Sequence, residues 1–240
     1  MTTGMIKAGI TYNPATAARR LKEGGVALLP TDTNYALGCV PWEEAVCARL
    51  YAIKQRPPEK PLTLFVRNAA EGRAYADLSP EEETLFKNLA GRFWPGPLNL
   101  IVRSGPRAPR HKYFDANSIS LVCNRNKALI DLLDAVGGPL ALTSANISGT
   151  NIDGLVSAGL AAKLFGDKIE VFVPAVDSGA DHAVQHHRVA SVASPIICRS
   201  ALAIEAHRGV AALANTLGIG CAMRLALRSD GCAQPTTSDR

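Results

Sequence analysis

The stretch that decides the fold is VALLPTDTNYALG, residues 26–38. Its first four residues are apolar and are followed by Pro30, which is typical of a short buried strand that runs into a loop. Residues 31–33 then supply two hydroxyl groups and one carboxylate, and Tyr35 supplies a flat aromatic face. Such a loop can bind a small polar ligand, but the same residue types also form turns that simply end a strand. Both interpretations stay open from this stretch alone.

Helices and strands are mixed on both sides of this stretch, which predicts an α/β or α+β class in one domain. Residues 14–23 predict a helix with Asn13 as its N-cap and two glycines after it. Residues 79–82 (Ser-Pro-Glu-Glu) begin another helix, with a serine cap and acidic residues in the first turn. Further helices are predicted at 43–52, 127–136 and 154–165, and strands at 62–66, 98–102, 119–123, 140–143, 170–173, 189–192 and 195–198.

The composition excludes several classes of protein. The chain has 240 residues, 47% hydrophobic and 20% charged, which is enough for one large domain with a real core. No apolar run approaches the roughly 18 to 20 residues that span a bilayer, and the first seven residues do not resemble a signal peptide. The six cysteines are widely spaced, which favours reduced thiols. We therefore expect a soluble, cytoplasmic protein, and the net charge of +5 suits a nucleotide or RNA.

Two further segments carry groups that suit an anion. Residues 54–61 (KQRPPEKP) combine three cations with three prolines, which predicts a stiff basic loop whose arginine and lysines can hold phosphate. A solvated surface loop is the alternative. Residues 143–149 (TSANISG) are small, so backbone N–H groups can approach an anion, and the side chains add donors. No Walker A or G-x-G-x-x-G pattern occurs, so a phosphate would need a different cradle.

Together these segments resemble the Sua5/YrdC/YciO family. The matching pieces are PTDTNYALG at 30–38, KQRPPEKPL at 54–62, FWPGPLNLIV at 93–102 and TSANISG at 143–149. Within the third piece, Trp94 and its prolines predict a structural turn. The resemblance covers about residues 12–200 and implies an α/β fold: a YrdC-like twisted mixed sheet, flanked by helices, with a concave basic cleft. It places a YrdC-like domain at 10–202 and a partly disordered C-terminal extension at 203–240.

The resemblance also implies an activity. Typical members condense L-threonine, bicarbonate and ATP, with Mg²⁺, into threonylcarbamoyl-AMP and pyrophosphate, and a separate transferase then modifies tRNA. It therefore implies a cytoplasmic nucleotidyltransferase whose chemistry depends on positioning and fixed charge rather than on a protein nucleophile. The implied catalytic residues are Lys54, Arg56, Ser144 and Asn146; the nucleotide-binding residues are Arg56, Lys60, Ser118, Ser144, Asn146 and Arg199; the substrate-binding residues are Thr31, Thr33 and Tyr35.

The chain departs from the family pattern in the amino-acid half of the site. Val122 stands where relatives carry an arginine that faces the amino acid, and Phe65 stands where longer relatives often carry a histidine. A carboxylate that lacks its cation binds about tenfold to more than a hundredfold more weakly. Two alternatives follow: a paralogue that uses another amine or a small-molecule carbamoyl acceptor, or a non-catalytic RNA-binding module. Retention of both the Lys-x-Arg and the Ser-x-Asn sets favours the enzyme.

Two further polar segments could be functional sites or ordinary surface loops. His182, His186 and His187 include an i, i+4 pair that could hold a metal, but no Cys or Glu lies close in sequence, which favours a polar loop. The basic stretch at 103–112 could meet RNA phosphates, and a solvated loop at the rim of the cleft is the favoured alternative.

Overall fold

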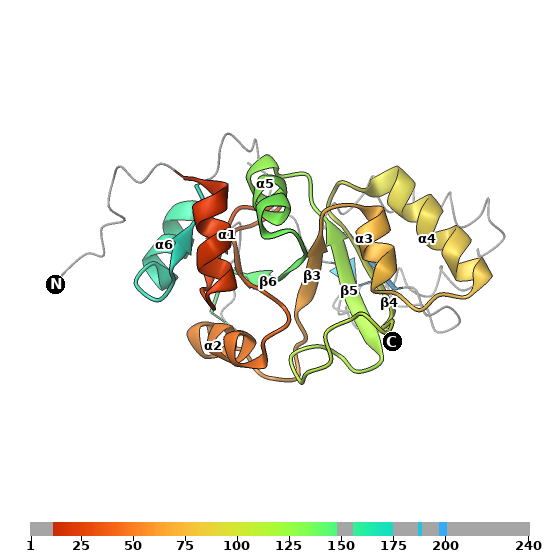
Figure 1. The fold of residues 1–240 in the computed structure, drawn as a ribbon, viewed down its shortest axis with the longest axis horizontal. Coiled ribbons are helices and arrows are strands. Elements are labelled where there is room, and N and C mark those ends of the chain that lie inside the picture. The colour runs from red at the N-terminus through yellow and green to blue at the C-terminus, as the bar shows by residue number, and fades with distance from the viewer. Residues whose placement is uncertain (1–11, 148–155, 175–186, 189–196, 201–240) are drawn as a thin grey trace, which may run out of the picture.

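The described residues build a nine-stranded mixed sheet with helices on both faces (Figure 1). The computed structural model describes residues 12–147, 156–174, 187–188 and 197–200. The sheet order is β7-β1-β2-β6-β3-β5-β4-β9-β8. The pairs β1–β7 and β3–β5 are parallel, and the other neighbours are antiparallel. The predicted mixture of helices and strands is therefore confirmed.

The strands are β1 (Ala27–Leu29), β2 (Ala36–Cys39), β3 (Thr63–Val66), β4 (Leu98–Arg103), β5 (Ser118–Cys123), β6 (Leu140–Ser144), β7 (Val171–Phe172), β8 (His187–Arg188) and β9 (Ile197–Ser200). The helices are α1 (Pro14–Lys22), α2 (Glu44–Lys54), α3 (Ala69–Ala74), α4 (Pro80–Phe93), α5 (Lys127–Val136) and α6 (Ala158–Phe165). Across the described segments, none of these helices combines the length and apolar character that a membrane crossing needs.

One half of the sheet, formed by β7, β1, β2 and β6, is covered on both faces. We call it the covered half. Helices α1 and α5 pack on one face of it, and α2 and α6 pack on the other. Strands β1 and β2 are buried at every residue, which explains why residues 26–29 read as a continuous apolar run.

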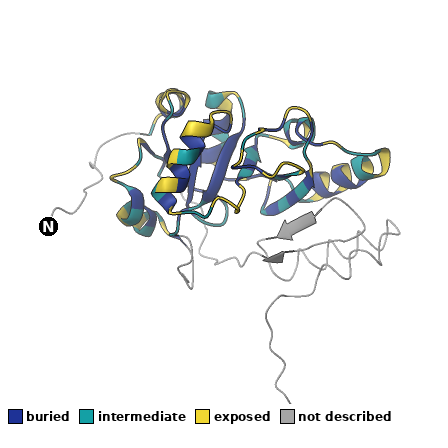
Figure 2. Ribbon diagram, turned by 90° about the horizontal axis from the view of Figure 1, so that it is seen from below, coloured by how far each residue is buried: buried dark blue, intermediate teal, exposed yellow. Residues whose placement is uncertain are grey.

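In the other half, formed by β3, β5 and β4, the described helices cover one face only. We call it the open half. Burial alternates along β3 and β4, so that every second side chain lies in the core near α4 and the others are half-exposed or exposed. Figure 2 shows that buried residues dominate the strands, whereas the helices also carry exposed residues. Thr63 and Phe65 on the open face are register partners of Leu142 and Leu140, which belong to the core beneath α1 and α5. The face that these two helices cover therefore continues onto β3, where Thr63 and Phe65 are half-exposed.

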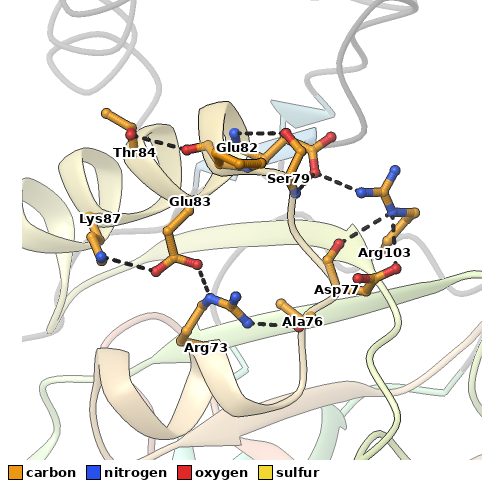
Figure 3. Close-up of polar contacts among 10 residues, drawn as sticks. Arg73, Ala76, Asp77, Ser79, Glu82, Glu83, Thr84, Lys87 and Arg103 are labelled. Carbon is orange, nitrogen blue, oxygen red and sulfur yellow. Dashed lines mark hydrogen bonds and ion pairs between the residues drawn. The ribbon is translucent and has the colours of Figure 1, made fainter.

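Helix α4 is tied to the open half by charged side chains (Figure 3). Ser79 and Glu82 form a capping box at its start, and Glu82 also accepts a hydrogen bond from Arg103 at the end of β4, at 2.8 Å. Glu83 in the same turn pairs with Arg73 of α3 and with Lys87 at 3.2 Å. These contacts hold α4 against the core-facing side of the open half.

Several predicted elements are confirmed, and others need correction. The helix predicted at 127–136 has those bounds, and Asn13 and Ser79 cap their helices as expected. Residues 36–38, predicted as part of a loop, belong to β2, and the short helix α3 was not predicted. The strand pair predicted at 189–192 and 195–198 corresponds in part to β9, while 189–192 and the predicted extension at 203–240 lie outside the described residues.

Candidate functional site

A pocket lies where the cover of the sheet changes. Strands β3, β4, β5 and β6 and the loop between β1 and β2 line a cavity of about 100 Å³. One wall is apolar and includes Phe65, Val122 and Leu142. The remaining lining is largely polar, with the hydroxyls of Thr31, Thr33, Thr63, Thr143 and Ser144 and the amides of Asn34, Asn99 and Asn124. Such a cavity suits a small ligand with one apolar side and several hydrogen-bonding groups.

The loop between β1 and β2 is held rigid by its own hydroxyl groups. Thr31 Oγ1 donates to the carbonyl of Asn34 at 2.6 Å and accepts from the backbone N–H groups of Thr33 and Asn34. Asn34 Oδ1 in turn accepts from the backbone N–H of Val156 at 2.8 Å. The sequence left a ligand-binding loop and a hydroxyl-capped turn as alternatives. The structure shows the turn and places Thr31 and Thr33 in the pocket lining.

Lys54 is buried beside the pocket: it contacts Thr143 and Ser144 of the lining but is not itself a lining residue. It is the last residue of α2 rather than the first residue of a loop, and only 1% of its surface is exposed. Its Nζ, which has three N–H groups, lies within hydrogen-bond distance of four oxygens: Thr143 Oγ1 at 3.0 Å, the Ser144 carbonyl, Ser144 Oγ at 3.1 Å and Asn146 Oδ1 at 3.2 Å. Burial, with the charges of Arg56 and Lys60, lowers the pKa of Lys54 to about 7. The structure thus joins three of the four predicted catalytic residues in one cluster.

The basic loop after α2 is stiff, as its prolines predict. Arg56 donates from Nε to the Lys60 carbonyl at 2.9 Å and from Nη2 to the Pro61 carbonyl at 2.8 Å, so its side chain closes the loop on itself. The Tyr51 hydroxyl also donates to the Lys60 carbonyl, at 2.5 Å. The Lys60 side chain is exposed. Neither Arg56 nor Lys60 lines the pocket, although both charges act on Lys54.

Asp32 is a site residue that the sequence analysis noticed only as a carboxylate in the loop. Its side chain is 5% exposed and lines the pocket. Oδ1 accepts a hydrogen bond from Asn124 Nδ2 at 2.6 Å. Burial raises the pKa of Asp32, while the Asn124 amide, the Arg125 backbone N–H and the Arg125 guanidinium act in the opposite direction. Asn124 was not predicted, because its partner is 92 residues away in sequence.

Tyr35 belongs to the pocket lining, as predicted, but its side chain also packs inside the protein. Its ring stacks on Phe172, with centroids 5.9 Å apart, and its hydroxyl donates to the Val173 carbonyl. Ser118 begins β5, where its backbone N–H donates to Asp115, and it is not part of the pocket lining. Arg199 is in β9 as the register partner of Asn99, a residue that lines the pocket.

Val122 and Phe65, the two departures from the family pattern, meet in the pocket. They are register partners across β5 and β3, and Val122 is also the partner of Asn99 in β4. Among the described residues that line the pocket, Asp32 is the one charged side chain and no lysine, arginine or histidine occurs. The basic cleft that the resemblance implies is therefore not seen in this lining, since the cations of α2 and its loop lie beyond the end of it.

The remaining polar segments have other roles or lie outside the described residues. In the basic stretch, Arg103 pairs with Asp77 and Glu82, and Lys112 lies 3.6 Å from Glu44. His182 and His186 fall outside the described residues, and only the backbone of His187 is described, in β8. Trp94 donates from Nε1 to the Leu98 carbonyl at 2.7 Å and packs edge-on against Phe86, which agrees with a structural role for the turn at 94–97.

Comparison with known proteins gives consistent matches. The Sua5/YciO/YrdC family model, described as telomere recombination, matches residues 19–201. A protein of Cellvibrio japonicus named threonylcarbamoyl-AMP synthase is 34% identical over 134 residues, which cover 55% of this chain and 69% of that protein. A protein of the same name from Pyrococcus abyssi is 31% identical over 157 residues, 65% of this chain and 45% of that protein. The chain thus spans less than half of the archaeal relative.

Solved structures agree with the fold. P. abyssi Sua5 complexed with L-threonine matches with a TM-score of 0.58 at 30% identity, over 66% of this chain and 45% of that one. Escherichia coli YciO matches with a TM-score of 0.56 at 24% identity, over 66% of this chain and 75% of that one. At 24% identity, the similarity to YciO supports the fold and nothing more.

Proposed function

The chain belongs to the Sua5/YciO/YrdC family, and from that premise we propose that it is an ATP-dependent carbamoyl-adenylate synthase. In this reaction the amine nitrogen bonds to the carbon of bicarbonate, a C–O bond breaks with loss of water, and an oxygen of the resulting carbamate attacks the α-phosphate of ATP. A new O–P bond forms, the bond between the α-phosphate and its bridging oxygen breaks, and pyrophosphate leaves. L-threonine is the default amine, because relatives are named threonylcarbamoyl-AMP synthase and the similar P. abyssi structure is complexed with L-threonine.

The observation that carries the proposal is the cluster of Lys54, Ser144 and Asn146 at the end of the pocket. A buried cation surrounded only by neutral oxygens is electrostatically incomplete, and an anion at that end would stabilise its charged form. The transition state at the α-phosphate gathers negative charge, which fixed cations and hydrogen-bond donors stabilise without rearrangement. Arg56 and Lys60, on the neighbouring loop, add positive charge that suits the leaving pyrophosphate.

Mg²⁺ would enter with the nucleotide. Within the part of the chain that the structure describes, no group of three or more His, Cys, Asp or Glu side chains could hold a metal ion. Nucleotide enzymes commonly bind Mg²⁺ through the phosphates and one or two carboxylates, so this residue set is compatible with a phosphate-borne ion. The adenylate would then pass its carbamoyl group to tRNA through a separate transferase.

A second candidate function, the same chemistry with an amine other than threonine, is favoured by the pocket lining. Val122 and Phe65 present apolar surface, and the described lining holds no cation for an α-carboxylate. The substitution Val122→Arg tests this directly. If the natural amine lacks a carboxylate, the arginine should improve the KM for L-threonine by about tenfold or more. A KM unchanged by Val122→Arg would count against that candidate.

The test of the main proposal is pyrophosphate release from ATP, Mg²⁺ and bicarbonate, with and without L-threonine, followed by mass spectrometry of the adenylate. We expect amine-dependent release that Arg56→Ala abolishes, with Arg20→Ala, an exposed arginine on α1, as the matched control. Release with another amine alone would select the second candidate. No release with any amine, together with salt-sensitive RNA binding, would contradict both and support a binding module.

A further inference from the structure

Asp32 carries a carboxylate oxygen that the protein leaves without a hydrogen bond. Oδ1 is bound to Asn124, but Oδ2 is buried and accepts no hydrogen bond from the described residues. The Arg125 Nε lies 3.9 Å from Oδ2, beyond hydrogen-bond distance, on a side chain that is 60% exposed and therefore well screened by water. A buried carboxylate oxygen without a donor is unfavourable, so this atom marks a place where a ligand can contribute one.

The orientation of this carboxylate is fixed. Asn124 is 2% exposed, and its Oδ1 accepts the backbone N–H of Asn126 at 2.9 Å. Turning the amide around would lose that bond and also the bond to Asp32, so Nδ2 must keep pointing at Oδ1. The loop that carries Asp32 is held by the hydroxyl of Thr31. Oδ2 is consequently the atom that Asp32 can offer to a ligand.

The chemistry of the surrounding lining selects the ligand group. Hydroxyl groups can donate or accept, and the apolar wall of Phe65, Val122 and Pro97 offers neither. Asp32 is the one charged side chain among the described lining residues, so the pocket favours a cationic group and disfavours an anionic one near Oδ2. A ligand ammonium group supplies both the positive charge and the missing donor.

We propose that Asp32 is the specificity-determining residue of this pocket and anchors the ammonium group of the amine substrate through Oδ2. That the bound amine is a substrate rests on the proposed carbamoyl-adenylate synthase function. It makes the substrate class a primary amine whose ammonium group, rather than any carboxylate, is recognised, and whose carbon skeleton lies against Phe65 and Val122. Burial raises the pKa of Asp32, which is consistent with a carboxylate that needs a positive partner.

Three probes separate the ammonium from the carboxylate. L-threonine has both groups, 1-aminopropan-2-ol has only the ammonium, and 3-hydroxybutanoate has only the carboxylate. Calorimetric titration of the full chain without ATP should show that 1-aminopropan-2-ol binds at least as tightly as L-threonine and that 3-hydroxybutanoate does not bind. Equal binding of 3-hydroxybutanoate and L-threonine would overturn the proposal, as would binding of none of the three probes.

The substitution Asp32→Asn keeps the shape of the side chain and removes its charge. It should weaken binding of both amines by about tenfold to a hundredfold, whereas Asp167→Asn, an exposed carboxylate after α6, should leave binding unchanged. Unfolding curves show whether Asp32→Asn is folded, and the probe comparison on the unaltered chain tests the proposal if it is not. Unchanged amine binding in Asp32→Asn would overturn it, and so would a loss confined to Mg²⁺ affinity.

Different results would contradict the role of Asp32 and the synthase activity. Threonine-dependent pyrophosphate release that persists with unchanged KM in Asp32→Asn would leave the synthase and overturn the role of Asp32. Conversely, amine binding that depends on Asp32 in a chain that releases no pyrophosphate would support the anchor and overturn the synthase.

Discussion

The two halves of the sheet use the same kind of strand for different purposes. In the covered half, both faces of β1, β2 and β6 pack against helices, and β6 also contributes Leu142, Thr143 and Ser144 to the pocket lining. In the open half, β3 and β4 commit one face to the core and leave the other to the pocket. The pocket lies at the boundary between them and takes its lining from both: Asp32 and Thr143 come from the covered half, and Phe65, Asn99 and Val122 come from the open half. The cover of the sheet, rather than its strands, decides where chemistry is possible.

The largest expected effect tests the difference between the two faces of the open half, by shortening two neighbouring side chains of β4. Leu100 is fully buried on the covered face, and the next residue, Ile101, is half-exposed on the open face. Leu100→Ala should lower the free energy of unfolding by about 2–5 kcal/mol because it leaves a cavity. Ile101→Ala should lower it by about 1 kcal/mol, since it removes little packed surface. Urea denaturation of both variants measures this, and equal losses would mean that the open face is as well packed as the covered one.

The second prediction concerns Lys54, which lies at the boundary. Its pKa is lowered to about 7 in the folded chain from an ordinary value of 10.5, so between these values the unfolded chain binds more protons than the folded one. Stability without ligand should therefore rise as pH increases from 7 to 10.5, by up to about 1.4 kcal/mol for each pH unit. Lys54→Met should lack this rise when both chains are unfolded by urea across that window. A parallel pH profile in the two chains would show that Lys54 titrates normally.

The third prediction concerns the tight packing of the covered half. A Cβ on Gly38 of β2 would lie 2.8 Å from Leu29 Cδ1 and 3.1 Å from Leu142 Cδ1. Because both leucines are enclosed, Gly38→Ala should lower the free energy of unfolding by about 1–3 kcal/mol. Gly91→Ala is the matched control: it lies on α4 with no atom within 4 Å of the new Cβ, and alanine should stabilise the helix by about 0.5–1 kcal/mol. Thermal unfolding should move the two melting temperatures in opposite directions.

Sequence reasoning succeeded where the determining groups are local. The bounds of α5 follow from an apolar helical pattern that ends at Gly137, and the structure places this glycine in the left-handed conformation that ends a helix. The start of α4 follows from the Ser79 capping box in the same way. The short helix α3 was missed because six residues carry little pattern. Its Gly72 is explained only by the Trp94 ring, 3.1 Å from where a Cβ would lie.

The site was predicted less completely, because its geometry depends on long-range contacts. The motif containing Lys54 suggested an exposed phosphate-binding loop, but its partners lie 89 to 92 residues further along the chain, and they draw the side chain into the protein. Asp32 stood in the first motif without an assigned role, since its burial and its unbound oxygen depend on Asn124 across the sheet. Three of the four segments that carry the family resemblance, 30–38, 93–102 and 143–149, contribute to the pocket lining, and 54–62 does not. The resemblance could not say which of their side chains face the pocket.

The smallest effect is expected where neither half of the sheet depends on the interaction, in the ion pairs that join α3 to α4 (Figure 3). Arg73 lowers the pKa of Glu83, so the stabilisation is present at neutral pH and is lost as the pH falls through the folded pKa, below the ordinary value of 4.5. Because Arg73 is 38% exposed and Lys87 is 70% exposed, Glu83→Gln should lower the free energy of unfolding by less than about 1 kcal/mol at neutral pH. The difference from the unaltered chain should shrink in 1 M salt and vanish in acid, which urea titrations at two pH values and two salt concentrations can measure. A loss as large as that of Leu100→Ala would mean that these charges, and not the apolar face of β4, hold α4 on the open half.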